Sequence, residues 1–338
     1  MILQYWQKEL PFKYPFTISN GRTKTHQPSL VVALSIGNFT GFGEAPAIAY
    51  YHITVEQMVA DLESKKQMVE KFALTDPERY WHYLHHLFPE NPFLVCALDM
   101  AAWDLFGQMK GKKLYQLWNT QWENTPVTDY TIGIDSIEKM LFKMKEQPWP
   151  IYKVKLGTDQ DIAIIKALRA ATDAVLRVDA NAGWTLEEAR EKIPQLAELG
   201  VEMIEQPLAK DNWEGMQQLY QESQLPLFAD ESCVFEQDVL RCANHFHGIN
   251  IKLTKCSGLT PARRMIAKGR ELGMKIMMGS MNESSIGAAA VANFLPQLDY
   301  VDMDGPLLLS QDMASGIHFD YGAVTLGGSA GLGVRVQF

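Results

Sequence analysis

The sequence predicts an α/β fold in which a modified (β/α)7β TIM barrel follows a smaller α+β domain. From about residue 126 to residue 311, eight short apolar runs alternate with seven amphipathic helical patterns. Before residue 118 the order is strands followed by helices, as in an α+β domain. The chain has 338 residues, 47% of them hydrophobic, which suits one barrel plus one smaller domain.

The first 118 residues are predicted to form the smaller domain. Residues 30–37 and 39–46 have the composition of two strands joined by a turn near Asn38. Helical periodicity then runs through residues 55–72, 78–88 and 94–109. After Leu309 the chain changes to short, glycine-rich, β-like segments, which we expect to return to the first domain. The predicted division therefore assigns 1–118 with 312–338 to the α+β domain and 119–311 to the barrel.

The barrel strands are expected at eight positions in chain order: residues 127–134, 152–157, 175–180, 201–206, 226–231, 248–253, 275–280 and 300–305. Residues 161–171, 185–200 and 260–273 are examples of the amphipathic helices between them. Because seven helical patterns separate eight strands, we expect the last helix of the barrel to be modified or missing.

Composition limits the partners and the compartment. The formal net charge of −9 argues against nucleic acid and against an anionic membrane surface. No apolar run approaches the roughly 18 residues that a membrane span needs, and the first residues lack a signal-peptide pattern. The four cysteines show no CxxC spacing and are typical of reduced thiols in a cytoplasmic protein. A small-molecule partner is expected, and a homo-oligomer stays open.

Three acidic residues stand where three successive strands are predicted to end. Asp179 and Glu205 are 26 residues apart, and Glu205 and Asp230 are 25 apart, about one β/α unit in each case. Their side chains would therefore meet at the C-terminal mouth of the barrel. Converging carboxylates repel one another unless a cation lies between them, which predicts a Mg²⁺ site. Each acid alone could instead be a helix N-cap or a solvated loop residue.

Three lysines are predicted to face the same cavity. Lys153 and Lys155 alternate along one strand and so share its inner face, while Lys252 ends the sixth strand. A lysine inside a barrel is costly unless it faces a polar cavity. The alternative is that the lysines only neutralise the carboxylates as buried ion pairs.

The order of the strands gives the lysines a chemical role. Lys155 on the second strand and Lys252 on the sixth would approach the barrel centre from opposite sides. A substrate carboxylate bound to Mg²⁺ would then hold its α-carbon between two amines, one acting as base and the other as acid. Removing a proton from one face and returning it to the other inverts the stereocentre. This arrangement predicts racemisation or epimerisation α to a carboxylate.

Several motifs together resemble the enolase superfamily, within its muconate-lactonizing-enzyme subgroup. They are K-x-K at 153–155, VDAN at 178–181, EQP at 205–207, ADES at 229–232, NIK at 250–252 and ALDMAAWDLFG at 97–107. The resemblance runs from about Phe12 to the C-terminus. It implies an α+β capping domain over the barrel, one Mg²⁺ per subunit on Asp179, Glu205 and Asp230, and Lys155 and Lys252 as the acid/base pair. Pairing of a lysine base with Mg²⁺ is a general property of that superfamily. The resemblance also implies that Lys153 contacts the substrate carboxylate.

The eighth strand separates the activities of the subgroup. VDMDGP places Asp302 and Asp304 on one side of the strand end, where a substrate cation such as a peptide α-ammonium is their natural partner. A solvated pair of acids is the alternative. This Asp-x-Asp resembles the dipeptide epimerases and implies that both aspartates bind the ammonium, with Thr131 and Ser280 lining the pocket.

The predicted function is a Mg²⁺-dependent dipeptide epimerase that moves a proton at the α-carbon of the C-terminal residue. L-Ala-D-Glu and L-Ala-L-Glu from murein peptide turnover are the favoured pair, because Arg22 resembles the residue that binds the glutamate side chain; a solvent-facing arginine is the alternative. Epimerases of other dipeptides, such as Ala-Ala or hydrophobic ones, stay open. So do a muconate cycloisomerase or o-succinylbenzoate synthase, and a degenerate barrel that only binds a ligand.

Overall fold

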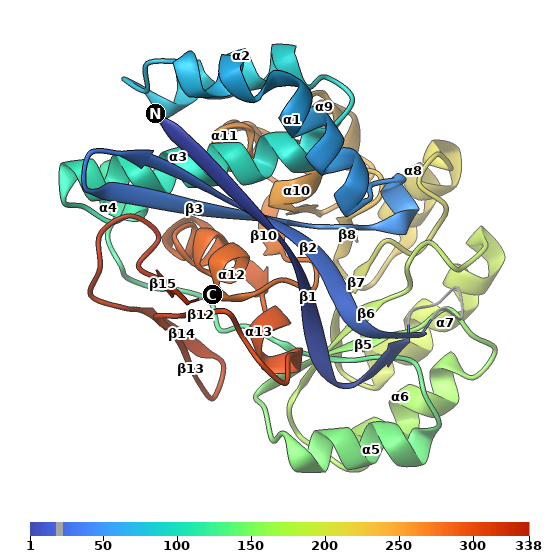
Figure 1. Ribbon diagram of the computed structural model, residues 1–338. Coiled ribbons are helices and arrows are strands. Elements are labelled where there is room, and N and C mark those ends of the chain that lie inside the picture. The colour runs from blue at the N-terminus through green and yellow to red at the C-terminus, as the bar shows by residue number, and fades with distance from the viewer. Residues whose placement is uncertain (18–22, 338) are drawn as a thin grey trace.

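The N-terminal part of the chain is an antiparallel sheet with helices packed on it (Figure 1). A computed structural model describes residues 1–17 and 23–337. The sheet has the order β1-β2-β3. Its elements and the helices that follow are β1 (Ile2–Thr17), β2 (Thr23–Ile36), β3 (Phe39–Pro46), η1 (Ala49–Tyr51), α1 (Val55–Lys71), α2 (Pro77–Leu87), α3 (Pro92–Lys110) and α4 (Leu114–Leu117). The sequence predicted β2, β3 and the three long helices but not β1.

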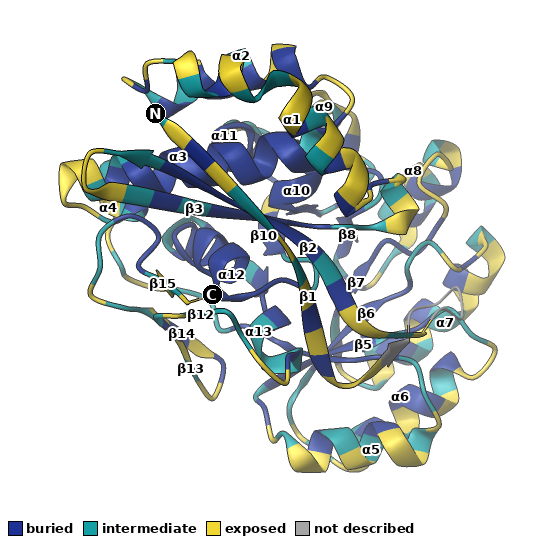
Figure 2. Cartoon of the chain, in the orientation of Figure 1, coloured by how far each residue is buried: buried dark blue, intermediate teal, exposed yellow. Residues whose placement is uncertain are grey.

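Helix α3 is the central element of this part. Most of its residues are buried, as its dark colour in Figure 2 shows. Strand β3 crosses α3 so closely that a Cβ on Gly43 would lie 1.9 Å from the carbonyl oxygen of Ala97, and one on Gly41 2.2 Å from that of Ala101. Glycine is therefore needed at both positions, because any side chain would force the strand away from the helix.

The predicted barrel is confirmed as an eight-stranded parallel sheet with strands in chain order from β4 to β11. A parallel bridge between Thr128 and Val301 joins its two edges. The strands are β4 (Tyr130–Ile132), β5 (Ile151–Lys155), β6 (Val175–Asp179), β7 (Val201–Glu205), β8 (Leu227–Ala229), β9 (Gly248–Ile251), β10 (Lys275–Gly279) and β11 (Tyr300–Asp302). Seven of them lie within the predicted segments, and β5 begins one residue before its predicted segment.

Helices follow most of the strands. They are α5 (Ile137–Glu146), α6 (Asp161–Arg169), α7 (Leu186–Glu198), α8 (Trp213–Glu222), α9 (Glu236–Cys242), α10 (Leu253–Cys256), α11 (Leu259–Glu271), α12 (Ser285–Ala292), η2 (Leu295–Gln297) and α13 (Gly305–Leu308). The short α13 follows the last strand where a full barrel helix would stand, which agrees with the expected modification of the last helix.

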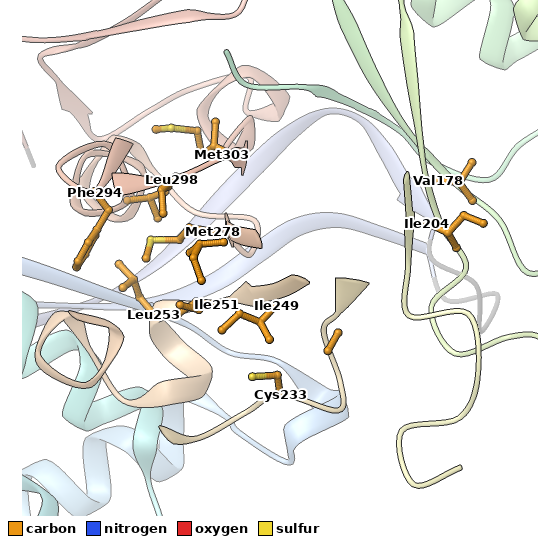
Figure 3. Packing of buried hydrophobic residues seen from close by; sticks show 14 of the residues in the cluster. Val178, Ile204, Cys233, Ile249, Ile251, Leu253, Met278, Phe294, Leu298 and Met303 are labelled. Atoms are coloured by element: carbon orange, nitrogen blue, oxygen red, sulfur yellow. The ribbon is translucent and has the colours of Figure 1, made fainter. Parts of the chain in front are cut away.

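Residues alternate between the outside and the inside of the barrel wall. Apolar side chains on strands β6 to β10 belong to one large cluster with residues of the surrounding helices (Figure 3). A second, small cluster of Met203, Phe228, Met277 and Tyr300 lies on the inner face, because Met203 stands two residues before Glu205 on the same strand. This apolar plug fills the barrel below its polar mouth.

After α13 the chain forms β12 (Ala314–Ser315), β13 (Ile317–Asp320), β14 (Ala323–Leu326) and β15 (Arg335–Val336). The glycine-rich segment then contacts the end of α3, where the backbone N–H of Leu332 donates to Asp104 Oδ1 at 2.8 Å and that of Gly331 to the Lys112 carbonyl at 2.9 Å. These contacts agree with the expected return of the chain. The exact boundaries at residues 118 and 312 stay predictions.

Two carboxylates of the N-terminal part cap helices of the barrel. Asp99 on α3 accepts hydrogen bonds from the backbone N–H of Thr260 at 3.0 Å and from its hydroxyl at 2.8 Å, at the start of α11. Glu44 on β3 accepts from the backbone N–H and the hydroxyl of Ser284, at the start of α12. Both side chains are fully buried, and each supplies hydrogen-bond acceptors where a helix exposes unpaired N–H groups.

None of the helices that the structure describes is both long enough and apolar enough to cross a bilayer.

Candidate active site at the barrel mouth

The three predicted metal ligands and the predicted acid/base lysines lie at the C-terminal ends of neighbouring strands. Lys155, Asp179 and Glu205 are the last residues of β5, β6 and β7, and they are paired in register. Asp230 and Lys252 directly follow β8 and β9. Two lysines therefore stand at the two ends of an arc that three carboxylates fill, as the spacing predicted.

Each carboxylate faces a lysine ammonium. Lys155 Nζ lies 2.6 Å from Asp179 Oδ2, and Lys252 Nζ lies 2.7 Å from Asp230 Oδ2. Lys153 Nζ lies between three acids, 2.7 Å from Asp302 Oδ2, 2.8 Å from Glu205 Oε2 and 3.3 Å from Asp179 Oδ2. Buried ion pairs, the alternative that the sequence left open, are therefore present.

The donor set nevertheless suits a hard divalent cation. In the described part of the chain no three His, Cys, Asp or Glu side chains gather tightly enough to hold a metal by themselves. However, Asp179, Glu205 and Asp230 are buried, belong to adjacent strands and offer only carboxylate oxygens, which Mg²⁺ prefers. Glu205 Oε2 lies near Lys153 but in a direction that forms no hydrogen bond, so this buried oxygen has room for another partner.

The lysines control the charge of these acids. Burial acts to raise the pKa of Asp179, but the ammonium groups of Lys155 and Lys153 outweigh it and lower the pKa to about 2. At Asp230 burial likewise acts to raise the pKa, and Lys252 and Lys255 lower it well below its ordinary value. The acids at both ends of the arc are therefore ionised at neutral pH, as metal ligands must be.

Lys255 is a site residue that the sequence reading missed. Its side chain is completely buried, and its Nζ lies 2.5 Å from Asp230 Oδ1 and 3.0 Å from the Cys233 carbonyl oxygen. It stands three residues after Lys252, one turn into the short helix α10. That spacing in KLTKC was the available signal, because i and i+3 positions share a helix face.

The predicted ammonium pair and its neighbours are brought together on the opposite side of the mouth. Asp304 Oδ2 accepts a hydrogen bond from the backbone N–H of Thr131 at 2.6 Å, and the N–H of Ser280 donates to the Asp302 carbonyl at 2.7 Å. Asp302 and Asp304 are 6% and 4% exposed, so neither is a solvated strand-end acid.

The two aspartates differ in charge. Burial acts to raise the pKa of Asp302, but the adjacent Lys153 ammonium lowers it below its ordinary value. Burial and the charge of Asp302 raise the pKa of Asp304 to about 7, although hydrogen bonds from Thr131 oppose the rise. A cation placed beside Asp304 would relieve this repulsion and ionise it.

A loop of the N-terminal part lies near the Lys252 end of the arc. The Tyr51 ring is 5.7 Å from that of Phe93 and 4.9 Å from that of Tyr50. Burial raises the pKa of Tyr51 to about 12, and the charges of Lys255, Asp230 and Lys252 also act on it. Arg22 lies outside the described residues, so its predicted role is not tested.

Comparisons with known proteins agree with this geometry. The family described as Enolase C-terminal domain-like matches residues 137–337. The chain is 51% identical over 327 residues to the L-Ala-D/L-amino acid epimerase of Flavobacterium johnsoniae, which covers 97% of each chain. It superposes on a substrate-liganded L-Ala-D/L-Glu epimerase from Bacillus subtilis with a TM-score of 0.94 and 29% identity, covering 99% of this chain and 98% of the other.

A third similar protein is a dipeptide epimerase from Cytophaga hutchinsonii whose solved structure contains Mg and the dipeptide D-Ala-L-Val. Its TM-score to this chain is 0.92 at 27% identity, with 99% of this chain and 95% of the other covered.

Proposed function

The chain belongs to the Enolase C-terminal domain-like family of the enolase superfamily, and from this premise we propose that it is a Mg²⁺-dependent dipeptide epimerase. The observation that carries the proposal is the position of Lys155 and Lys252 at opposite ends of the three-carboxylate arc, with Asp302 and Asp304 across the mouth. An acid/base group on each face of an α-carbon can remove its proton from one side and return a proton to the other, which inverts that carbon.

The proposed roles follow from the positions. Asp179, Glu205 and Asp230 would hold one Mg²⁺, which supplies positive charge to the substrate carboxylate while its α-proton is absent. Lys155 and Lys252 exchange a proton with the α-carbon of the C-terminal residue, each on its own face. The pKa of Lys153 is raised, because the charges of Asp302 and Glu205 outweigh the effect of burial. Lys153 therefore stays charged and orients the substrate carboxylate.

The other end of the dipeptide would lie against the second set of residues. Asp302 and Asp304 bind the α-ammonium, and Thr131 and Ser280 border them. This requirement for an ammonium favours dipeptides over the substrates of muconate cycloisomerase or o-succinylbenzoate synthase, which lack one.

The proposed substrates begin with L-alanine, and L-Ala-D-Glu and L-Ala-L-Glu from murein peptides are the first pair to test. Arg22 would contact the glutamate side chain. A broader range of C-terminal residues is the second candidate, because the 51% identical relative is named an L-Ala-D/L-amino acid epimerase. We also propose a cytoplasmic location, since the four cysteines are free and buried, and a capping domain of residues 1–118 with 312–338.

The test is α-deuterium exchange. The Mg²⁺-loaded protein is incubated in D₂O with a panel of L-Ala-D-X and L-Ala-L-X dipeptides, and mass spectrometry and chiral chromatography follow the label and the configuration. We expect deuterium at the C-terminal residue together with inversion.

Asp304→Asn should lower kcat/KM for these dipeptides, whereas Asp320→Asn, at an exposed position in the β13–β14 hairpin, is the matched control and should not. If both Asp304→Asn and Asp320→Asn turned over N-acylated amino acids as fast as free dipeptides, no ammonium would be recognised. That result would refute the proposal.

A further inference from the structure

Buried charged residues inside the barrel connect the apolar plug with the proposed ammonium site. Arg177, the member nearest the plug, is 4% exposed, and its guanidinium carbon lies over the ring of Tyr300, 4.9 Å from the ring centre. Arg177 Nε donates to Glu202 Oε2 at 2.7 Å, and Nη1 donates to Asp129 Oδ2 at 3.0 Å. Neither the lysine chemistry nor the metal site uses these residues.

Asp129 connects this arginine to the ammonium site. It is completely buried, and its second carboxyl oxygen, Oδ1, has no hydrogen-bond partner in the described structure. The neighbouring acid is Asp302, because the residues that precede the two acids, Thr128 and Val301, form a parallel bridge at the seam of the barrel. Two neighbouring buried carboxyl groups can share a hydrogen bond only when one of them keeps its proton.

The surrounding charges identify which of the two keeps it. Asp302 lies 2.7 Å from the Lys153 ammonium, whereas the arginine beside Asp129 is already paired with Glu202. Burial and the charge of Asp302 raise the pKa of Asp129 well above its ordinary value, against the effect of Arg177. An ionised Asp129 would also leave Oδ1 buried and unpaired, which is costly.

We propose that Asp129 is a positioning residue that stays protonated and donates a hydrogen bond from Oδ1 to Asp302, holding Asp302 in place for the substrate ammonium. This role depends on the proposed dipeptide epimerase function. The acid group never touches the substrate; it fixes the orientation of the aspartate that does.

Asparagine is the informative substitution at this position. In Asp129→Asn the amide N–H replaces the acid O–H as the donor to Asp302, while the amide oxygen still accepts from Arg177. In Asp129→Ala both contacts are lost. We expect Asp129→Ala to raise KM for L-Ala-D-Glu by roughly 10- to 100-fold with little change in kcat, and Asp129→Asn to rescue most of that loss.

A simple salt bridge predicts the reverse. If Asp129 were the ionised partner of Arg177, the neutral asparagine would be as damaging as alanine. Equal impairment of Asp129→Asn and Asp129→Ala would therefore overturn the proposal. Should Asp129→Ala fail to fold, the asparagine variant decides alone, because its KM stays close to that of the wild type only if a neutral donor is what the site requires.

Infrared spectroscopy tests the proton without any turnover. The difference spectrum between the wild type and Asp129→Asn at neutral pH should contain the C=O stretch of one protonated carboxylic acid, and Asp320→Asn should not produce it. A wild type that exchanges no dipeptide α-proton would defeat the proposed function while the infrared band still reported the protonated acid. A missing band in an active enzyme would defeat only the role of Asp129.

Discussion

The raised pKa of Asp304 predicts that recognition of the substrate ammonium depends on pH. Burial and the nearby charge of Asp302 raise its pKa from the ordinary 3.8 to about 7. A raised pKa means that the carboxyl group still carries its proton just below neutral pH. The neutral acid cannot form an ion pair with an ammonium, so substrate capture should weaken as the pH falls through 7.

The size of the effect follows from the pKa. At pH 5, roughly two units below it, about one carboxyl group in a hundred is ionised, so kcat/KM should be about 100-fold, or about 2.7 kcal/mol, below its value for the fully ionised acid. Between pH 7, where about half of the groups are ionised, and pH 5 the fall should be about 50-fold. The dipeptide itself does not titrate in this window, because its α-ammonium has a pKa of about 7.7–8.0 and its α-carboxyl of about 3.3–3.7. With the ordinary pKa of an aspartate the profile would be nearly flat.

The assay is initial-rate α-deuterium exchange between pH 5 and 7, with a dipeptide whose C-terminal side chain does not ionise. Asp304→Asn should have a lower kcat/KM at pH 7 and a flat profile below it. A flat wild-type profile would refute the reasoning. An equal slope in Asp304→Asn would also refute it and would assign the titration to another group, such as Glu231, whose pKa burial and Asp230 raise to about 8.

Three further predictions concern the acid/base pair, the metal and the packing of α3. Lys155→Met and Lys252→Met should each abolish epimerisation yet retain exchange with one epimer only, because the remaining lysine faces one side of the α-carbon; mass spectrometry showing exchange of both epimers would contradict this. Mg²⁺ at about 100 times its Kd should stabilise the fold by about 2.7 kcal/mol, measured by calorimetry, and EDTA should stop exchange. Gly43→Ala should destabilise the protein by about 1–3 kcal/mol in urea unfolding, since the new Cβ would meet a backbone oxygen at 1.9 Å, whereas Gly328→Ala, with nothing within 4 Å, should not.

The sequence predicted the barrel well because its signals are local. Each strand is a short apolar run, and the acids Asp179, Glu205 and Asp230 recur once per repeat, so their convergence follows from counting residues. Strand β1 was missed because it mixes charged residues with Pro11 and Pro15 and has no clean alternation. It becomes a strand by pairing along most of its length with the buried β2.

The remaining features depend on contacts between distant parts of the chain. Lys255 and Asp230 are partners across 25 residues, and Asp129 and Asp302 are neighbours across the seam of the barrel. The spacing of Lys252 and Lys255 suggests a shared helix face, but a single sequence does not say which acid that face meets, and it gives no reason to join Asp129 to Asp302. Ion pairing between the lysines and the carboxylates is one of the alternatives that the sequence leaves open, but only the geometry shows that each ammonium has a specific acid beside it.

The two capping contacts described above make the N-terminal part and the barrel unsuitable as interchangeable modules. Helix α11 is preceded by Gly258, which has no side chain to cap it, and its capping carboxylate comes from Asp99 more than 150 residues earlier. The first turn of α12 likewise takes a carboxylate from Glu44. A chimaera that joined this barrel to the N-terminal part of another protein would leave both helix starts without their acids. Only an N-terminal part with carboxylates at the same two places would replace them.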